Sequence, residues 1–210
     1  MKKNIISFFA VALSFGCFAQ QFNLGKVSFA TDSIWVISGN GISQIWSDAV
    51  QTDSCSNKTT FNGSIFDRDI NDIVFFVDCR SNPNYKGDLF SWLAVSEFKD
   101  VLCPYPWRVP TKQDFVNLNI ALGGIEYNDQ LSTIIQNKYL TDWGATYGGY
   151  SVLRGSLWSQ NNGAFYWSQS EIGAHNGYYL NFEQEDDMVE ELTIMSNKGL
   201  GLSLRCVRDN

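Results

Sequence analysis

The sequence predicts an α+β domain with antiparallel sheets, two to three helices and long loops. Three observations support this class. A hairpin signal lies near residue 40, helical spacing of apolar residues is confined to residues 87–140, and strand-like alternation dominates the last third of the chain. Because strands and helices are segregated along the chain, the pattern argues against a parallel sheet built from strand–helix–strand units.

Residues 33–50 form the predicted hairpin. Its two strands flank Asn40-Gly41, a dipeptide that tolerates the positive φ angles of a tight turn. Residues 47–86 are mostly polar and contain one apolar run at 73–77, so we expect loops around a short strand.

Two helices are predicted on either side of a proline-rich segment. The first covers residues 87–103, with Asp88 as its cap and Pro104 as its end. The second follows Thr111, a good N-cap, and Asp114 three residues later completes a capping box.

Gly123-Gly124 ends the second helix, and residues 129–140 predict a third, short one. The chain then becomes rich in glycine, serine and aromatic residues. Strands are predicted over residues 177–184, 189–195 and 200–209. In the last of them, one side carries Leu202, Leu204 and Cys206, and the other carries Ser203, Arg205 and Val207.

The first nineteen residues have the pattern of a secretory signal peptide. Two lysines precede a short apolar stretch at 5–15, and Ala19 is a small residue at the expected cleavage point. Lipidation at Cys17 is the weaker interpretation because bulky Phe15 spoils the lipobox. We therefore expect an exported protein in the extracellular space or at the cell surface, with the periplasm as the alternative.

Residues 20–210 suit a single domain. The whole chain carries a net charge of −7, and removal of the lysine-bearing signal makes it more negative. This charge argues against nucleic acids and against anionic membrane surfaces as partners. No segment beyond the signal is apolar for long enough to predict an integral membrane span.

Four cysteines remain after the signal, and an even number in an exported chain favours two disulfides. Three pairings are open. We favour Cys55–Cys79, which closes a polar insertion, and Cys103–Cys206, which connects the central loop to the last strand. The chain has no CxxC motif and a single histidine, so we expect no metal and no cofactor.

Three segments carry a resemblance to a known family: "LCPYPWRVPTKQDFVNL", "AFYWSQSE" and "GLSLRCVRD". Together they resemble the Fibrobacter succinogenes major paralogous domain family over about residues 42–209. The residues that match its marks are Cys103, Trp107, Arg108, Val109, Pro110, Thr111, Tyr166, Trp167, Ser168, Arg205, Cys206 and Val207. The resemblance implies a fold similar to C-type-lectin-like and sulfatase-modifying-factor domains.

The first of these segments is interpreted as structural. Its prolines stiffen the turn, and Pro110-Thr111 begins a helix. Trp107 is expected to be a core anchor, and Arg108 an internal tether to loop carbonyls or a carboxylate. Tyr166 and Trp167 are expected to be mostly in the core as well.

The resemblance to lectin-like folds implies that the binding face is formed by the loops between the strands in the last third of the chain. Exposed aromatic rings can stack on sugars, while amide and imidazole groups supply hydrogen bonds. We expect Trp158 and Tyr178 to be exposed. The candidate binding residues are Tyr147, Tyr150, Trp158, Asn161, Asn162, His175, Asn176 and Tyr178.

The favoured function is a non-catalytic binding or adhesion module for a glycan or protein ligand. No set of catalytic residues stands out, and the acidic run at 183–191 lacks the glycine and spacing of a calcium loop. One alternative is an enzyme related to sulfatase-modifying factor, which would need a reactive cysteine. Another is a structural subunit of a surface or fimbrial assembly, with a strand near residues 22–30 available for exchange.

Overall fold

The computed structural model describes residues 27–28, 34–49, 51–52, 75–76, 89–124, 133–152, 157–184 and 194–209. The predicted signal peptide and the predicted Cys55–Cys79 disulfide lie outside these ranges. The strands before the helices are β1 (Val27–Ser28), β2 (Ile34–Gly39), β3 (Ile42–Asp48), β4 (Gln51–Thr52), β5 (Phe75–Phe76) and β6 (Leu89–Phe90).

The helices are α1 (Trp92–Glu97), α2 (Lys99–Leu102), α3 (Lys112–Ala121) and α4 (Thr133–Thr141). The later strands are β7 (Tyr150–Ser151), β8 (Leu157–Trp158), β9 (Gly163–Ile172), β10 (Asn176–Glu183), β11 (Ile194–Asn197) and β12 (Arg205–Asp209). All the strand pairs of these sheets are antiparallel. The predicted α+β class is therefore confirmed.

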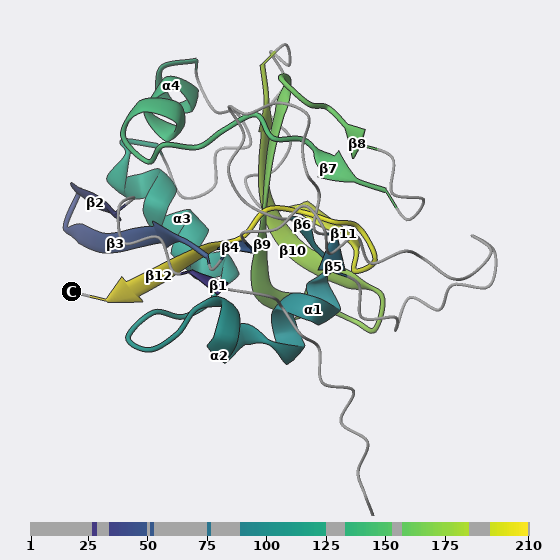
Figure 1. Ribbon diagram of the computed structural model, residues 1–210. Helices are drawn as coiled ribbons and strands as arrows, with labels where there is room; N and C mark the ends of the chain where they lie inside the picture. Colours follow the sequence, from purple (N-terminus) through teal and green to yellow (C-terminus); the bar gives the residue numbers. More distant parts are fainter. Residues whose placement is uncertain are drawn as a thin grey trace, which may run out of the picture.

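Two three-stranded sheets dominate the fold, with strand orders β12-β3-β2 and β11-β10-β9. The β9–β10 hairpin extends through the middle of the molecule (Figure 1). Strands β7 and β8 lie beside its upper end, and α1 lies beside its lower end. Helices α3 and α4 are on the left of the same view, with α3 next to the first sheet and α4 above α3.

The predicted turn at Asn40-Gly41 connects β2 to β3. Both residues have positive φ angles, 51° and 79°, which the mirror-image turns of two-residue hairpins require. The predicted capping box of α3 is also present, because Thr111 and Asp114 each bind the backbone N–H of the other. These local signals were sufficient to place both features.

The single helix predicted over residues 87–103 is wrong. Leu89 and Phe90 form β6, which pairs with β5, and Phe90 also exchanges two backbone hydrogen bonds with Leu202. The helix that follows is capped by Ser91 instead of Asp88. Phe98, with φ −109° and ψ 21°, separates α1 from α2. Pairing with distant segments overrides the local helical pattern at residues 89–90. Because of the break at Phe98, the described part contains four helices where two to three were predicted.

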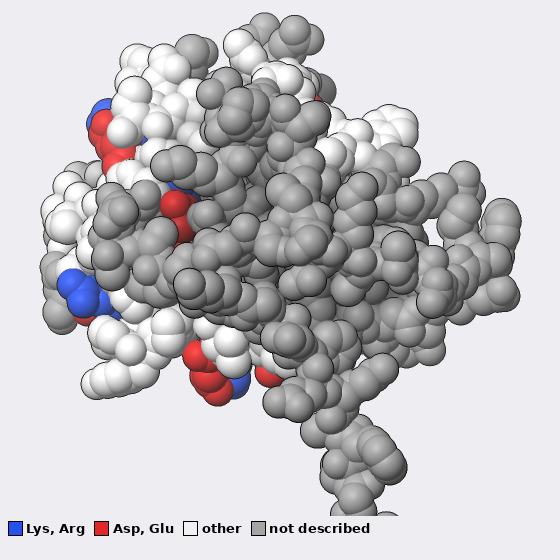
Figure 2. All heavy atoms as spheres, in the orientation of Figure 1, with Lys and Arg blue, Asp and Glu red and all other residues white. Residues whose placement is uncertain are grey.

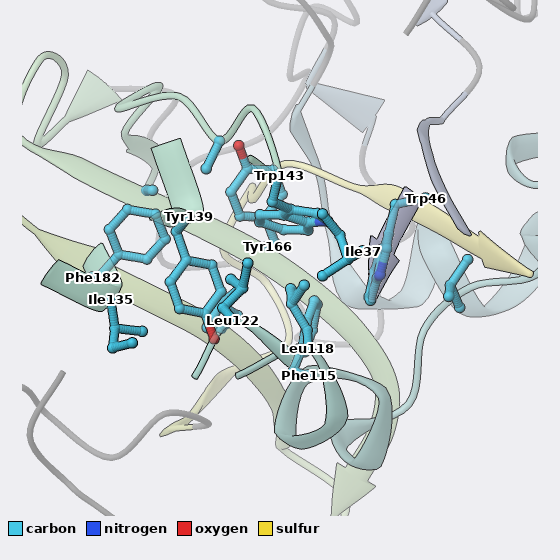
Figure 3. Close-up of a cluster of buried hydrophobic side chains, with 14 residues drawn as sticks. Ile37, Trp46, Phe115, Leu118, Leu122, Ile135, Tyr139, Trp143, Tyr166 and Phe182 are labelled. Carbon is cyan, nitrogen blue, oxygen red and sulfur yellow. The ribbon is translucent and has the colours of Figure 1, made fainter. Parts of the chain in front are cut away.

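Alternating side chains of β9 and β12 enter two different cores. The first core includes Trp46, Phe115, Leu118, Tyr139, Trp143, Tyr166 and Val207. The second core includes Phe90, Trp92, Trp107, Phe165, Trp167, Leu204 and Cys206. The predicted alternation along β12 is thus correct, and both of its faces are buried. Figure 3 shows the first core, where Trp46 stacks on Phe115 at 5.6 Å between ring centroids.

Arg205 is a buried cation in this aromatic core, only 3 % exposed. Its guanidinium lies 3.9 Å from the ring centroid of Trp35 and 4.5 Å from that of Trp143. It donates hydrogen bonds to the carbonyls of Trp143 and Gly144 and to Asp48. Gly144 is required there, because a Cβ at this position would lie 2.5 Å from Nε1 of Trp35.

The neighbouring residue, Cys206, is bonded to Cys103. This is the pairing that the sequence analysis favours. The two cysteines are 103 residues apart, and in the chain-entropy model a crosslink over a loop of that length stabilises the fold by about 4.7 kcal/mol. Trp107 packs in the same core, which confirms its predicted role as an anchor.

Arg108 binds a carboxylate, as predicted for the tether. Its two terminal nitrogens donate to the two oxygens of Asp114 at 2.6 and 2.9 Å, and one of them also reaches Asp209 at 3.1 Å. Asp114 additionally accepts the backbone N–H and the hydroxyl of Thr111, both at 2.7 Å. One buried carboxylate therefore joins the proline-rich loop to the start of α3.

Replacement of Arg205 by lysine should lower the free energy of unfolding by about 2–4 kcal/mol. Lysine keeps the charge, but it cannot stack flat between two tryptophans while donating to two carbonyls. Urea denaturation of the oxidised protein measures the loss. The control is Arg208→Lys, because Arg208 stacks on Trp107 alone. Similar small losses in both variants would contradict the assigned role of Arg205.

Asp114→Asn should lower the free energy of unfolding at neutral pH by about 2 kcal/mol. Burial raises the pKa of Asp114, but hydrogen bonds from Arg108 and Thr111 lower it and prevail, so the pKa lies below its ordinary value of 3.8. The stabilisation is complete above that value and is lost as the pH falls through the lower, folded-state pKa.

Urea titrations between pH 7 and pH 2 check this prediction. The difference between the wild type and Asp114→Asn should shrink as the pH falls. Asp209→Asn is the control, because Asp209 contacts the same guanidinium from an exposed position and should contribute less than about 1 kcal/mol. A difference that persists unchanged at pH 2 would show that the charge of Asp114 is not responsible.

Candidate functional site

The structure divides the eight predicted binding residues into groups at opposite ends of the β9–β10 hairpin. Gly163 pairs with Glu183 at one end, and Ile172 pairs with Asn176 at the other. Because β9 spans ten residues, these ends are about 30 Å apart. The residues that precede Gly163 and those that surround the turn at His175 therefore cannot contact one small ligand together.

The upper end carries an exposed tryptophan. Trp158 of β8 pairs with Tyr150 of β7, and its side chain is 57 % exposed. The polar segment Ser159, Gln160, Asn161 and Asn162 follows directly and leads into β9. We call Trp158–Asn162 together with Glu183 the Trp158 rim.

The backbone of the Trp158 rim has a demanding conformation. Ser159 and Asn161 have φ angles of 51° and 65°, and they are two of the three non-glycine residues with positive φ in the described ranges. Such conformations require support from the surrounding structure, and they cluster at functional sites. Gly149 supplies close support: a Cβ there would lie 2.2 Å from the carbonyl oxygen of Trp158.

Main-chain hydrogen bonds hold the segment in place. Asn161 donates to the carbonyl of Tyr147 at 2.9 Å, and Gly163 donates to that of Ser159 at 2.8 Å. Gln184 of the adjoining strand end donates to the carbonyl of Asn162 at 2.8 Å. The rim is therefore connected to the loop before β7 and to the end of β10.

Glu183 places a carboxylate beside this segment. It accepts hydrogen bonds from the hydroxyl of Ser159 and the amide of Asn162, both at 3.4 Å. Gln136 of α4 donates to the backbone carbonyl of Glu183, which connects α4 to the rim. Sequence reasoning did not include Ser159, Gln160 or Glu183 among the binding residues, although the polar run after an aromatic residue is a signal for the first two.

Tyr147 and Tyr150 are half-buried, and their rings pack against aromatic rings of the two cores. Tyr147 packs edge-on against Phe182 at 5.9 Å, and burial raises the pKa of its hydroxyl above 10.0. Tyr150 packs edge-on against Phe165 at 4.8 Å. Each tyrosine thus contacts a core, and Trp158 is the exposed ring among these three.

The turn at the lower end of the hairpin is hydrogen-bonded to the segment that follows β11. His175 is exposed, and its carbonyl accepts the backbone N–H of Lys198 at 3.0 Å. Lys198 is buried, binds Glu171 and lies 4.2 Å from the ring centroid of Trp92.

Asn176 and Tyr178 at this end are half-buried, and Lys112 lies 4.4 Å above the Tyr178 ring. Tyr178, which was expected to be exposed, is therefore only partly so. Its ring is covered by a side chain of α3.

Charged side chains of the described residues form only small areas on the face shown in Figure 2. At its upper right, most of the described atoms are white. Elsewhere on this face, the described acidic and basic side chains form small mixed groups. Within the described ranges, no three histidine, cysteine, aspartate or glutamate side chains are grouped closely enough to hold a metal ion. None of the helices in those ranges is long and apolar enough to span a membrane.

Comparison with known proteins identifies one family. The model of the Fibrobacter succinogenes major domain matches residues 36–208, from β2 to β12, and so includes both cores and the Trp158 rim. No curated protein and no solved structure matches the chain. Since the matched residues make up well over half of the sequence, the chain belongs to the Fibrobacter succinogenes major domain family.

Proposed function

We propose that the protein is an exported, non-catalytic binding or adhesion module that recognises a glycan or a protein through the Trp158 rim. The observation that carries this proposal is the exposed Trp158 ring, which continues into a polar segment of constrained backbone. An exposed tryptophan beside amide and hydroxyl groups is the usual composition of a sugar-stacking or protein-binding surface.

A C-type-lectin-like arrangement is part of the proposal. Its support is the combination of antiparallel sheets and flanking helices (Figure 1). Binding through loops held by a rigid scaffold is a general solution for such folds.

The enzyme alternative has less support. A sulfatase-modifying-factor-like activity needs a reactive cysteine, and Cys103 and Cys206 are buried and bonded to each other. These two residues are therefore poor nucleophiles, and Cys55 and Cys79 lie outside the described residues.

Trp158→Ala should reduce binding to the protein's ligand at least about tenfold, because truncation of a central aromatic contact commonly costs 2 kcal/mol or more. Glycan arrays and pull-downs with oxidised protein identify the ligand, and titration calorimetry measures the loss. Tyr105→Ala is the matched control, because Tyr105 is an aromatic residue that is 97 % exposed in the proline-rich loop.

The control separates this site from the rest of the surface. Tyr105→Ala should bind like the wild type, and both variants should keep their thermal stability. A ligand that binds Trp158→Ala with unchanged affinity would contradict the proposed site. A wild-type protein that binds no ligand in any screen, and that shows a hydrolytic or oxidative activity instead, would contradict a binding function.

A second candidate function, a structural subunit, is favoured by strand β2. It lies at the edge of its sheet, carries no charged residue, and exposes Ile34 and Val36, the latter by 63 %. In a two-residue hairpin the backbone groups of Ile34, Val36 and Ser38 point away from β3. The β1 strand considered for exchange is instead paired with Gln51–Thr52 of its own chain.

At such an uncharged edge, the β2 strands of two copies of the protein can pair in antiparallel orientation. The protein is negatively charged, and two copies that meet at β2 bring no charged side chains of this strand together. Val36→Lys should then abolish concentration-dependent assembly measured by light scattering. Ile134→Lys, which changes an exposed apolar residue of α4, is the control. A wild type that remains monomeric at all concentrations would rule out this assembly.

A further inference from the structure

We propose that one face of the first sheet, formed by Val36, Ile45 and Arg208, docks an acidic segment of a protein partner, whose carboxylate binds the guanidinium of Arg208. We call these three residues the Arg208 row. The inference goes beyond the proposed function, because β2, β3 and β12 lie on the left of Figure 1, away from β8 at the upper right. Its support is the continuity of the row, a cation without a described ionic partner, and the ring on which that cation rests.

The strand register places the three side chains of the Arg208 row next to one another. Val36 of β2 pairs with Ile45 of β3, and Ile45 pairs with Arg208 of β12. Directly paired residues of antiparallel strands project from the same face of a sheet. Since neighbouring strands lie about 4.8 Å apart, the row is about 10 Å long. Val36 is 63 % exposed, and Ile45 and Arg208 are half-buried, so each member of the row reaches the surface.

Arg208 has no acidic partner within the described part of the chain. The ion pairs found there use Arg108, Lys198 and Arg205. The next residue, Asp209, lies on the other face of the sheet and binds Arg108. The Nε of Arg208 is buried and has no hydrogen-bond partner among the described residues. Although the chain has a net charge of −7, exposed charges more than about 8 Å away are largely screened at physiological salt, so Arg208 can attract a carboxylate locally.

Trp107 limits the movement of this guanidinium. The Cζ of Arg208 lies 4.8 Å from the ring centroid of Trp107, which is packed in the second core and 9 % exposed. A guanidinium that is already positioned loses less conformational entropy when it binds, and its fork of N–H groups matches a carboxylate. Arginine beside a tryptophan is also a combination that is enriched at protein interfaces.

The rest of the row is aliphatic, which favours a polypeptide over an acidic polysaccharide. Ile45 packs against the second core, and Ile34, two residues before Val36 on the same face, is 47 % exposed. Such a surface is best covered by apolar side chains, whereas sugar rings stack on aromatic ones. An extended peptide advances about 3.3 Å per residue and alternates its side chains, so an acidic residue and an apolar residue two positions away can contact the two ends of the row.

The test uses an array of synthetic heptapeptides. Each carries one aspartate or glutamate with valine, isoleucine or leucine two positions away, and stands beside its asparagine or glutamine counterpart. Polygalacturonate represents acidic polysaccharides. Fluorescence polarisation measures binding of the full, oxidised protein. We expect acidic peptides to bind at least about tenfold more tightly than their amide counterparts, and Arg208→Gln to remove this preference. Arg208→Lys, which keeps the charge without the fork, should retain part of it.

Two matched controls separate the row from the rest of the surface. Lys112→Gln removes the same charge from another half-buried cation above a ring, that of Tyr178, and should bind like the wild type. Val36→Ser should weaken binding of both peptide forms about threefold or more, because it removes apolar contact area. Ile134→Ser changes an exposed apolar residue of α4 and should have no effect. Thermal denaturation checks that each variant is folded.

The outcomes distinguish this inference from the proposed function. Equal losses in Arg208→Gln and Lys112→Gln would assign binding to net charge and overturn the site. Peptide binding that is lost in Trp158→Ala but kept in Arg208→Gln would place the peptide at the Trp158 rim and overturn the inference as well. A wild type that binds none of the acidic peptides, or that binds polygalacturonate through Arg208 instead, would also overturn it and leave recognition at the Trp158 rim untouched.

Discussion

The buried guanidinium of Arg205 is the interaction on which the rest of the molecule depends. It connects the last strand to Asp48 at the end of β3 and to the backbone after α4, and it fills the space between two tryptophans. The next residue, Cys206, is covalently bonded to the loop after α2. Because a buried charge must keep its partners, these segments have little freedom to move relative to one another. Two consecutive residues of β12 thus hold together elements from both ends of the sequence.

This constraint reaches the Trp158 rim through a short path. Arg205 holds the carbonyls of Trp143 and Gly144, and the chain from there leads within three residues to Tyr147. The carbonyl of Tyr147 accepts the N–H of Asn161, whose backbone has a positive φ angle. A conformation of this kind persists only when its surroundings hold it, and here the support originates in the first core. The proline-rich loop serves a different purpose, since Arg108, Trp107 and Cys103 all contribute to the stability of the scaffold.

Structural features that depend only on residues close in sequence could be predicted. Features that depend on pairing between distant segments could not. Asn40-Gly41 and the Thr111–Asp114 capping box specify their own geometry. Residues 87–103 also have a local helical pattern, but Leu89–Phe90 pair with Phe75–Phe76 as a strand, and Phe90 also bonds to Leu202. The same limit applies to the candidate binding residues. Asn161 and His175 both lie in the Gly- and aromatic-rich part of the sequence, but the length of β9 places them at opposite ends of the hairpin. The exposure of Trp158 was expected from the sequence. That Glu183 belongs to the Trp158 rim follows only from its pairing with Gly163, which the sequence does not show.

The central claim is that ligand recognition occurs at the Trp158 end of the hairpin, on a scaffold that does not rearrange. Nuclear magnetic resonance of the 15N-labelled, oxidised protein, titrated with the strongest ligand from the arrays, tests it most directly. The indole N–H of Trp158 and the backbone amides of residues 159–163 should shift, while those of residues 173–176 and the core indoles of Trp46 and Trp167 should not. Shifts centred on the turn at His175, or spread through both cores, would contradict the claim.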